Sequence, residues 1–176
     1  VRRNETSPLV AMKTLNYGDC ILQKRAATAR GIDEPLFLNT KGQVAEGATS
    51  NIFAVIDGEV VTPPVSCGLL PGVMRDFVLR VTGAKERPLM PEDLMQADEV
   101  FSTNSLMGAM PVRSIEEQGV SCGNDCAKAR QVGQRVAQQV AQPVACQINE
   151  AYREEVRAMC ARWKQEEDPW GQLFGR

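Results

Sequence analysis

The sequence contains no histidine among its 176 residues. This absence excludes a Ser/His/Asp triad, a Cys/His nucleophile pair and any zinc site that uses imidazole ligands. Acid and base catalysis would therefore have to use lysine, tyrosine, cysteine or carboxyl groups whose pKa values the fold has shifted. Lysine becomes the first residue type to consider as a catalytic group.

Long apolar runs and a large excess of one charge are also missing. No stretch approaches the roughly 20 apolar residues of a membrane span, and no basic-then-apolar signal peptide opens the chain. Twenty Lys and Arg stand against 22 Asp and Glu, which gives a net charge of -2. A broad basic face for phosphates is therefore not expected. We expect a cytoplasmic protein that binds neither nucleic acid nor membranes.

The six cysteines show no metal-ligand spacing, and Cys122 and Cys126 form an isolated pair. This pattern favours reduced thiols over a disulfide framework and predicts no metal site. With 43% apolar residues the chain is long enough for one domain with a substantial core. Because it begins with Val1 and opens like the middle of a sequence, we expect a fragment or a processed piece.

Helical and strand patterns alternate along the first two thirds of the chain, which predicts a mixed α/β fold. Residues 17–30 carry Ile21, Leu22, Ala26 and Ala29 near helical spacing. Two β-branched segments, 51–56 and 59–62, flank Asp57-Gly58, and this pair suits a type I′ hairpin turn. Further expected elements are strands over 35–39, 85–89, 99–103 and 110–115, and helices over 91–96 and over 73–81 with Phe77, Val78 and Val81 inward.

The character of the sequence changes after residue 118. Residues 121–125 read as a polar loop, and 127–141 carry a narrow helical stripe of valines. A second amphipathic stretch follows, whose apolar side chains are suited to core or partner packing. We therefore divide the chain into a domain at 1–118 and a helical extension at 119–176 packed on it. The stripe of the second stretch consists of Ile148, Tyr152, Val156, Met159 and Trp163.

Three segments could carry chemistry. Lys13 lies in an apolar setting within residues 11–17, where partial desolvation would lower its pKa and make it a nucleophile; a surface lysine is the plainer interpretation. Residues 46–53 place an acid and small residues ahead of a strand, or are simply a loop. Residues 70–75 begin a helix whose amides form an anion site, or are a routine helix start.

In this order, the three segments resemble the class IV pyridoxal-phosphate (PLP) enzymes, the family of D-amino-acid and branched-chain aminotransferases and 4-amino-4-deoxychorismate lyase. The resemblance covers residues 2–115. It implies that Lys13 is the Schiff-base lysine and general base, and that Glu46 keeps the pyridine nitrogen protonated so that the ring accepts electrons. The other implied positions are Tyr17 near the ring hydroxyl, Asn51 of the family motif, Leu70 under the ring, phosphate-binding amides of Gly72, Val73 and Met74, and Asn104 with Ser105 completing the phosphate cup.

Within the family, residues 72–75 and 104–112 look most like the lyases. The sequence is therefore interpreted as a lyase that releases pyruvate and leaves 4-aminobenzoate for folate synthesis. A D-amino-acid or branched-chain aminotransferase is the alternative. A third hypothesis is a non-catalytic fragment, since the family has an N-terminal domain, with a phosphate-binding arginine, that these residues do not match.

The resemblance also implies the fold and the partners. The fold would be α/β, with a mixed sheet that curls into a partial barrel flanked by helices. The substrate would be a small amino compound, and the protein would be a homodimer when the N-terminal domain is present. In the 176-residue chain, the helical extension is the candidate cover for apolar surface that would face that domain.

Overall fold

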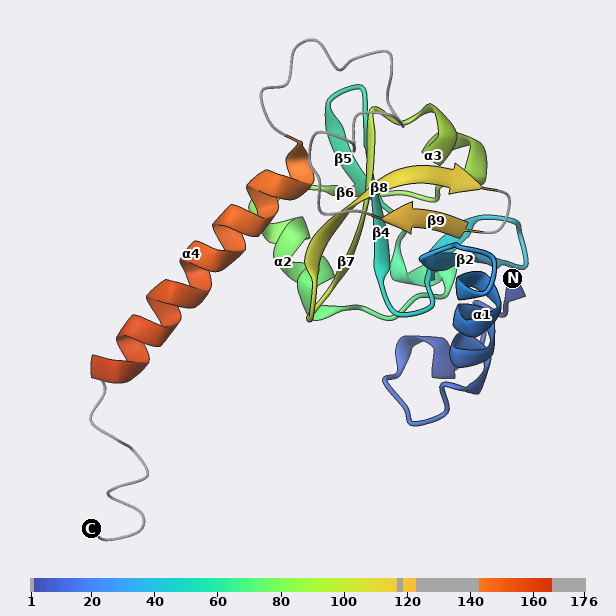
Figure 1. Cartoon of the computed structure of the whole chain (residues 1–176), viewed down its shortest axis with the longest axis horizontal. Helices are drawn as coiled ribbons and strands as arrows, with labels where there is room; N and C mark the ends of the chain where they lie inside the picture. Colours follow the sequence, from blue (N-terminus) through green and yellow to red (C-terminus); the bar gives the residue numbers. More distant parts are fainter. Residues whose placement is uncertain (1, 117–118, 123–142, 166–176) are drawn as a thin grey trace, which may run out of the picture.

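The computed structural model describes residues 2–116, 119–122 and 143–165, and the described strands form one mixed sheet with helices packed against it (Figure 1). The order is β1-β2-β9-β8-β7-β4-β5-β6, and β3 lies off this path and pairs with β2. The strands are β1 (Arg2–Arg3), β2 (Glu34–Asn39), β3 (Val44–Gly47), β4 (Asn51–Ile56), β5 (Glu59–Thr62), β6 (Lys85–Glu86), β7 (Glu99–Asn104), β8 (Gly108–Glu116) and β9 (Gly119–Cys122).

The central hairpin of β4 and β5 confirms the turn expected from the sequence. Asp57 and Gly58 both have positive φ, 52° and 78°, as a type I′ turn requires. The turn sets the register that pairs Ala54 with Val61. On its other side β4 pairs antiparallel with β7, so that Asn51 lies opposite Thr103. These two polar residues therefore share one end and one face of the sheet.

The helices are α1 (Gly18–Thr28), α2 (Val73–Thr82), α3 (Pro91–Gln96) and α4 (Val144–Gln165), with short 3-10 turns at Pro8–Ala11 and Val65–Cys67. Each helix expected before residue 116 is present, but two inward faces differ. In α1, Ile21 and Leu22 are exposed and Ala27 is the buried residue. In α2, Phe77 and Val78 are buried, whereas Val81 is exposed. No described helix is long and apolar enough to cross a membrane.

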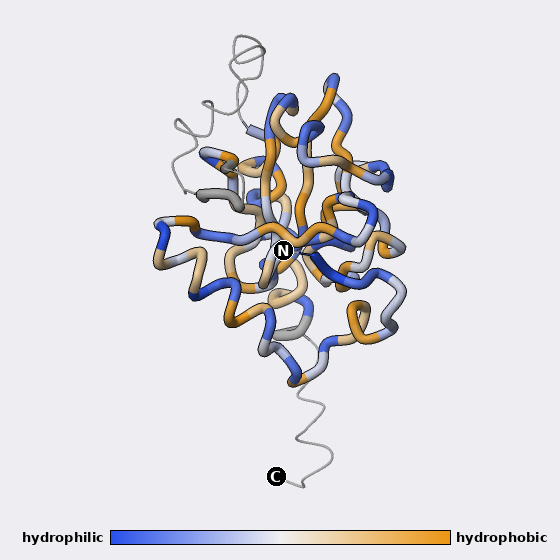
Figure 2. Tube along the Cα trace, turned by 90° about the vertical axis from the view of Figure 1, so that its right-hand side faces the viewer, coloured by the Kyte–Doolittle hydropathy of each residue, from blue (hydrophilic) through white to orange (hydrophobic). Residues whose placement is uncertain are grey.

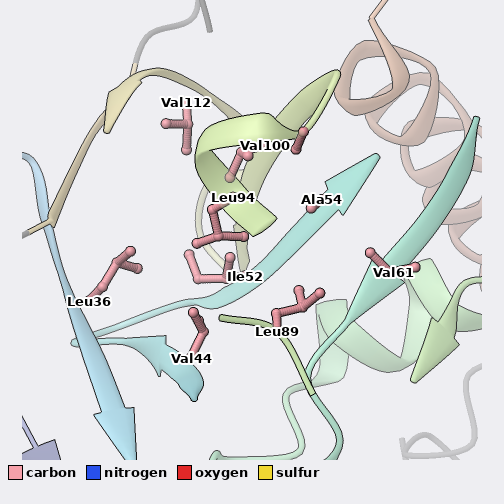
Figure 3. Close-up of a cluster of buried hydrophobic side chains, with 10 residues drawn as sticks. Leu36, Val44, Ile52, Ala54, Val61, Leu89, Leu94, Val100 and Val112 are labelled. Atoms are coloured by element: carbon pink, nitrogen blue, oxygen red, sulfur yellow. The ribbon is translucent and has the colours of Figure 1, made fainter. Parts of the chain in front are cut away.

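Two apolar clusters lie on opposite sides of the central strands. One joins the β-strands to α3, and its side chains converge in Figure 3. The other packs α2 and α4 against β4, β7 and β8, with the rings of Phe53 and Phe101 stacked 5.1 Å apart. The hydropathy colouring in Figure 2 shows apolar residues along the strands and hydrophilic residues at many of the turns. The strands that carry Asn51 and Thr103 are thus supported from both faces.

Helix α4 is fixed to the sheet at its first turns. The Glu99 carboxylate accepts hydrogen bonds from the Val144 and Ala145 amides at 2.7 and 2.9 Å, which satisfies unpaired donors at the helix start. Asn149 bonds to both backbone groups of Ala109. Ile148 is 2% exposed, whereas Val156 is 38% exposed where the helix extends away from the sheet (Figure 1).

Several expectations need correction. The described strands form no barrel, because the pairing runs as an open path from β1 to β6. Strand β3 was not expected; it forms because Val44–Gly47 finds a partner in β2, and it includes the first two residues of the segment at 46–53. Strand β9 includes two residues of the expected loop at 121–125, because it pairs with both β8 and β2. Cys20, Cys67 and Cys160 are free thiols, as the sequence predicts, whereas Cys146 is in a disulfide.

Other expectations are not tested by the described residues. The helix expected at 127–141 and the Trp163 side chain lie outside them. The division at residue 118 stays a prediction. The covering role of the stripe also stays a prediction; within it, Ile148 and Tyr152 pack against the α2 cluster, whereas Met159 is exposed.

Candidate active site

A cavity of about 1000 Å³ lies between the N-terminal segment, β3, the start of α2 and the β7–β8 turn. It brings together all ten positions singled out from the sequence, although they span more than ninety positions of the chain. These are Lys13, Tyr17, Glu46, Asn51, Leu70, Gly72, Val73, Met74, Asn104 and Ser105.

Glu46 is buried in the wall of this cavity and lies within a polar network. One carboxylate oxygen accepts the Leu70 amide at 3.0 Å and the Asn51 side-chain amide at 3.4 Å, and the other accepts the Arg3 guanidinium. Asn51 also donates to the Leu70 carbonyl at 2.8 Å. Desolvation raises the pKa of Glu46 to about 7, although Arg3 and the Leu70 amide oppose it. The carboxyl therefore changes charge near neutral pH.

The turn between β3 and β4 is held by a second buried carboxylate, that of Glu34. It accepts hydrogen bonds from the Thr49 amide at 2.7 Å and the Ser50 hydroxyl at 3.0 Å, and it pairs with Lys24. Gly47 is required here, because a Cβ atom would collide with the Glu34 and Ser50 side chains. The result is a tight return of the chain that sets Glu46 and Asn51 side by side.

The start of α2 offers backbone donors to the cavity. Gly72 is the N-cap residue, and no side chain caps the helix. The first amides of a helix have no intrahelical partner, so those of Val73 and Met74 can bind an anion. Gly72 touches the Asn51 side chain where a Cβ atom would stand. Asn51 thus connects the carboxylate to the helix start.

The β7–β8 turn lies beside this helix start. The Asn104 side-chain oxygen accepts the Leu106 and Met107 amides at 3.0 and 2.8 Å, so it shapes the turn. Ser105 is exposed at the tip. Both residues line the cavity, Asn104 as the organiser of the turn and Ser105 as the exposed hydroxyl.

The lysine segment, residues 11–17, agrees with the plainer of the two interpretations, that of a surface lysine. Lys13 lines the cavity but is exposed, so the partly desolvated setting inferred from its neighbours is wrong for this chain. Its amine lies 3.5 Å from the Tyr17 hydroxyl and 5.3 Å from the Tyr17 ring centre. The side chains of Met12 and Leu15 are themselves exposed, which explains the difference.

Two polar residues that line this cavity, Arg3 and Thr103, were not singled out from the sequence. Arg3 contacts Glu46, yet a two-residue strand gives no recognisable pattern. Thr103 also lines the cavity and is 2% exposed, and its hydroxyl has no hydrogen-bond partner among the described residues. Thr103 pairs with Asn51 across β4 and β7, and this pairing is the signal that could have found it. An unpaired buried hydroxyl beside a cavity is suited to a polar ligand atom.

The comparison with known families identifies the chain. A model of class IV aminotransferases matches residues 1–115. The chain belongs to the class IV aminotransferase family. Members of this family use PLP, and the chain is thus part of a PLP-dependent enzyme family. This confirms the family-level interpretation of the three sequence segments.

Individual relatives refine the comparison. A protein of Methanocaldococcus jannaschii named "Putative branched-chain-amino-acid aminotransferase" is 40% identical over 111 residues, 60% of this chain and 38% of that protein. The branched-chain aminotransferase of Escherichia coli K12 is 34% identical over 123 residues, 67% of this chain and 39% of the enzyme. The chain therefore spans about two fifths of the length of these relatives.

A solved structure of a branched-chain aminotransferase is similar in fold to this chain. The branched-chain aminotransferase of Thermobaculum terrenum in its PLP form has a TM-score of 0.71 at 28% identity, covering 94% of this chain and 51% of that enzyme. The superposition therefore extends past residue 115. The curated relatives are mostly branched-chain aminotransferases, which favours the alternative over the lyase.

Proposed function

We propose that this chain is the PLP-binding part of a branched-chain-type aminotransferase. The observation that carries the proposal is the convergence of an amine, a buried carboxylate and an uncapped helix start on one cavity. Each group matches a different part of the cofactor. The chain spans only part of the length of its relatives. The aminotransferase reaction of a whole enzyme that contains this chain is therefore also part of the proposal.

The residues present fit PLP by their chemistry. Glu46 would accept a hydrogen bond from the protonated ring nitrogen and so keep it protonated, because its carboxylate has about four acceptor sites and three are used. Leu70 would lie under the ring. The α2 amides would bind the phosphate, with Ser105 and the unpaired Thr103 hydroxyl as further polar groups near it. When bound, PLP supplies an electron sink for the substrate α-carbon.

Lys13 would bind the cofactor covalently and then move the α-proton. This role needs no histidine, in agreement with the composition. Tyr17 lies close enough to orient the lysine amine. The exposure of Lys13 predicts slow chemistry in the isolated chain, because water competes for the amine.

The rim of the cavity supports an incomplete site. Five exposed apolar side chains line it: Leu9, Met12, Val73, Leu106 and Met107. Apolar surface gathered around a cavity is typical of a face that another part of the protein covers. We propose that an N-terminal domain of the family type covers it in a homodimeric cytoplasmic enzyme.

A lyase acting on 4-amino-4-deoxychorismate is the second candidate. Met74 follows Gly72 and Val73, as in the lyase pattern that the sequence resembles. A Legionella pneumophila protein named "Putative 4-amino-4-deoxychorismate lyase" has a TM-score of 0.64 at 32% identity over 71% of this chain and 48% of that protein. Both reactions would use Lys13 and Glu46, so site variants cannot separate them.

Product analysis separates the two reactions. The PLP-treated chain is incubated for hours with L-leucine and a 2-oxo acid that accepts the amino group and, separately, with 4-amino-4-deoxychorismate, with Lys13→Ala as the control. We expect the 2-oxo acid of leucine to form faster than pyruvate and 4-aminobenzoate, and neither to form with the variant. Faster release of pyruvate would establish the lyase instead. No product from either substrate, in a chain that retains PLP, would support the non-catalytic fragment.

A further inference from the structure

Three neighbouring strands place Arg3 and Glu46 on one face of the sheet. Arg3 on β1 pairs with Asn39 of β2, and Glu46 on β3 pairs with Phe37 of the same strand. Side chains two positions apart on a strand point to the same face, and cross-strand partners share that face. The backbone register therefore sets the guanidinium and the carboxylate over the Phe37 side chain from opposite edges of β2.

The Arg3 side chain is fixed in this position by three contacts. Its guanidinium lies over the Phe37 ring, 4.4 Å from the ring centre, and donates to the Cys20 sulfur at 3.1 Å. The third contact is the ion pair with Glu46, in which both side chains are largely buried, at 13% and 10% exposed. A planar group held on its face and at two edges has little freedom to leave.

We propose that Arg3 is a positioning residue for Glu46: it fixes one carboxylate oxygen and favours the ionised form of the group, with an acceptor site left toward the cavity. The part of this inference that concerns a cofactor ring rests on the proposed function. The ion pair itself does not. Arg3 touches neither substrate nor cofactor in this account and acts through Glu46.

Of the other charged groups around Glu46, one favours its protonated form. Glu34, on β2, raises the pKa of Glu46. Asp19 and Cys20 of α1 line the same cavity, as do Lys13 and Tyr17. Desolvation raises the pKa of Cys20 and Arg3 lowers it, and the same two causes act on Glu46. Among these causes Arg3 is the one positive side chain that lowers the pKa of Glu46.

The test is a carboxyl titration of the 176-residue chain without cofactor. The chain is labelled with ¹³C at glutamate carboxyls, and Glu46→Gln identifies the signal. For wild type we expect a midpoint near the pKa of about 7. Arg3→Gln should raise it by about one unit or more, because an opposite charge within about 4–6 Å shifts a carboxyl by that amount. Arg3→Lys should restore most of the shift.

Two controls keep the test decisive. Arg2→Gln removes a neighbouring exposed arginine of β1 and should leave the Glu46 midpoint unchanged. If Arg3→Gln does not fold, the guanidinium ¹⁵N signals of Arg3 in wild type replace it. Their chemical shifts should change with pH at the same midpoint as the Glu46 carboxyl. An unchanged midpoint in folded Arg3→Gln, or Arg3 signals that do not follow Glu46, would overturn the proposal.

A second readout separates this inference from the proposed function. The absorbance of PLP added to the chain is followed against pH for wild type and Arg3→Gln. A displaced absorbance midpoint in the variant supports both the positioning role of Arg3 and the binding of PLP. A carboxyl shift with no binding of PLP by wild type supports the ion pair and overturns the cofactor role. Bound PLP with the same carboxyl midpoint in both chains overturns the positioning role alone.

Discussion

Glu46 and Lys13 line the same cavity, but Glu46 is buried among three polar partners, whereas Lys13 is exposed and reaches Tyr17 at 3.5 Å. We refer to Glu46, Asn51 and Leu70 with their supporting strands as the carboxylate wall. Its contacts come from strand register, a tight turn and a helix start. The lysine segment precedes the first long helix and has few such constraints. A complete sequence motif therefore does not imply equally organised side chains.

The largest expected effect concerns the support behind the carboxylate wall. Ile148→Ala should lower the free energy of unfolding by about 2–5 kcal/mol, because the residue is 2% exposed in the cluster behind β4 and β7. The matched control is Val156→Ala on the same helix. Its side chain is 38% exposed, and we expect a loss below about 1 kcal/mol. Urea unfolding of both variants measures the difference; equal losses would show that α4 does not support this wall.

The second prediction concerns the charge of the carboxylate wall. Because the pKa of Glu46 rises from 4.5 to about 7 on folding, its contribution to stability is fully present below pH 4.5 and is lost as the pH rises through 7. The loss amounts to about 3 kcal/mol. Urea unfolding from pH 4 to 8 should show this decline in wild type and a flatter curve in Glu46→Gln.

Glu99 serves as the control for that experiment. Burial also raises its pKa, so it adds a decline of the same sign. Glu99→Gln should therefore keep the part of the slope that belongs to Glu46. If the curves of wild type and Glu46→Gln run parallel, the burial of the Glu46 charge is not what the structure indicates.

The sequence predicted much of the fold because local signals were strong. Asp57-Gly58 suits the positive φ angles that a type I′ turn requires and that the hairpin shows. Pro91 begins α3 as expected. Strand β3 was missed because four residues, two of them small, carry no alternation. The exposed face of α1 was missed because helical spacing alone does not say which side meets the sheet.

The candidate site was predictable to a different extent. The family resemblance located ten positions that line one cavity. Arg3 and Thr103 were missed because their importance depends on pairing between strands that lie far apart in sequence. The exposure of Lys13 could not be inferred either, since it depends on whether the apolar neighbours of the lysine find a partner.

A third prediction concerns the turn that shapes the carboxylate wall. Glu34→Gln should cost about 1–3 kcal/mol, because buried hydrogen bonds to Thr49 and Ser50 lose a charged acceptor. Glu59→Gln is the control, since its ion pair with Lys85 is exposed and should contribute less than about 1 kcal/mol. Thermal unfolding compares the two, and a larger loss in Glu59→Gln would contradict the role of Glu34.

The smallest effect is expected at Thr103. Thr103→Val keeps the shape of the side chain and removes a buried hydroxyl that has no hydrogen-bond partner among the described residues. Stability should stay unchanged or rise, because an unsatisfied buried polar group costs about 1–3 kcal/mol. Affinity for PLP, measured by absorbance, should fall. A clear loss of stability without ligand would mean that the hydroxyl is already satisfied.

The most direct test of the account locates the covalent attachment of PLP. The chain is treated with PLP, reduced with borohydride and digested, and the pyridoxyl group is located by mass spectrometry. The account predicts the label on Lys13, an exposed residue that lines the same cavity as Glu46. Lys13→Ala should lose the label while its stability is unchanged. Labelling of Lys24 or Lys41 in place of Lys13, or equal labelling of all lysines, would contradict the account.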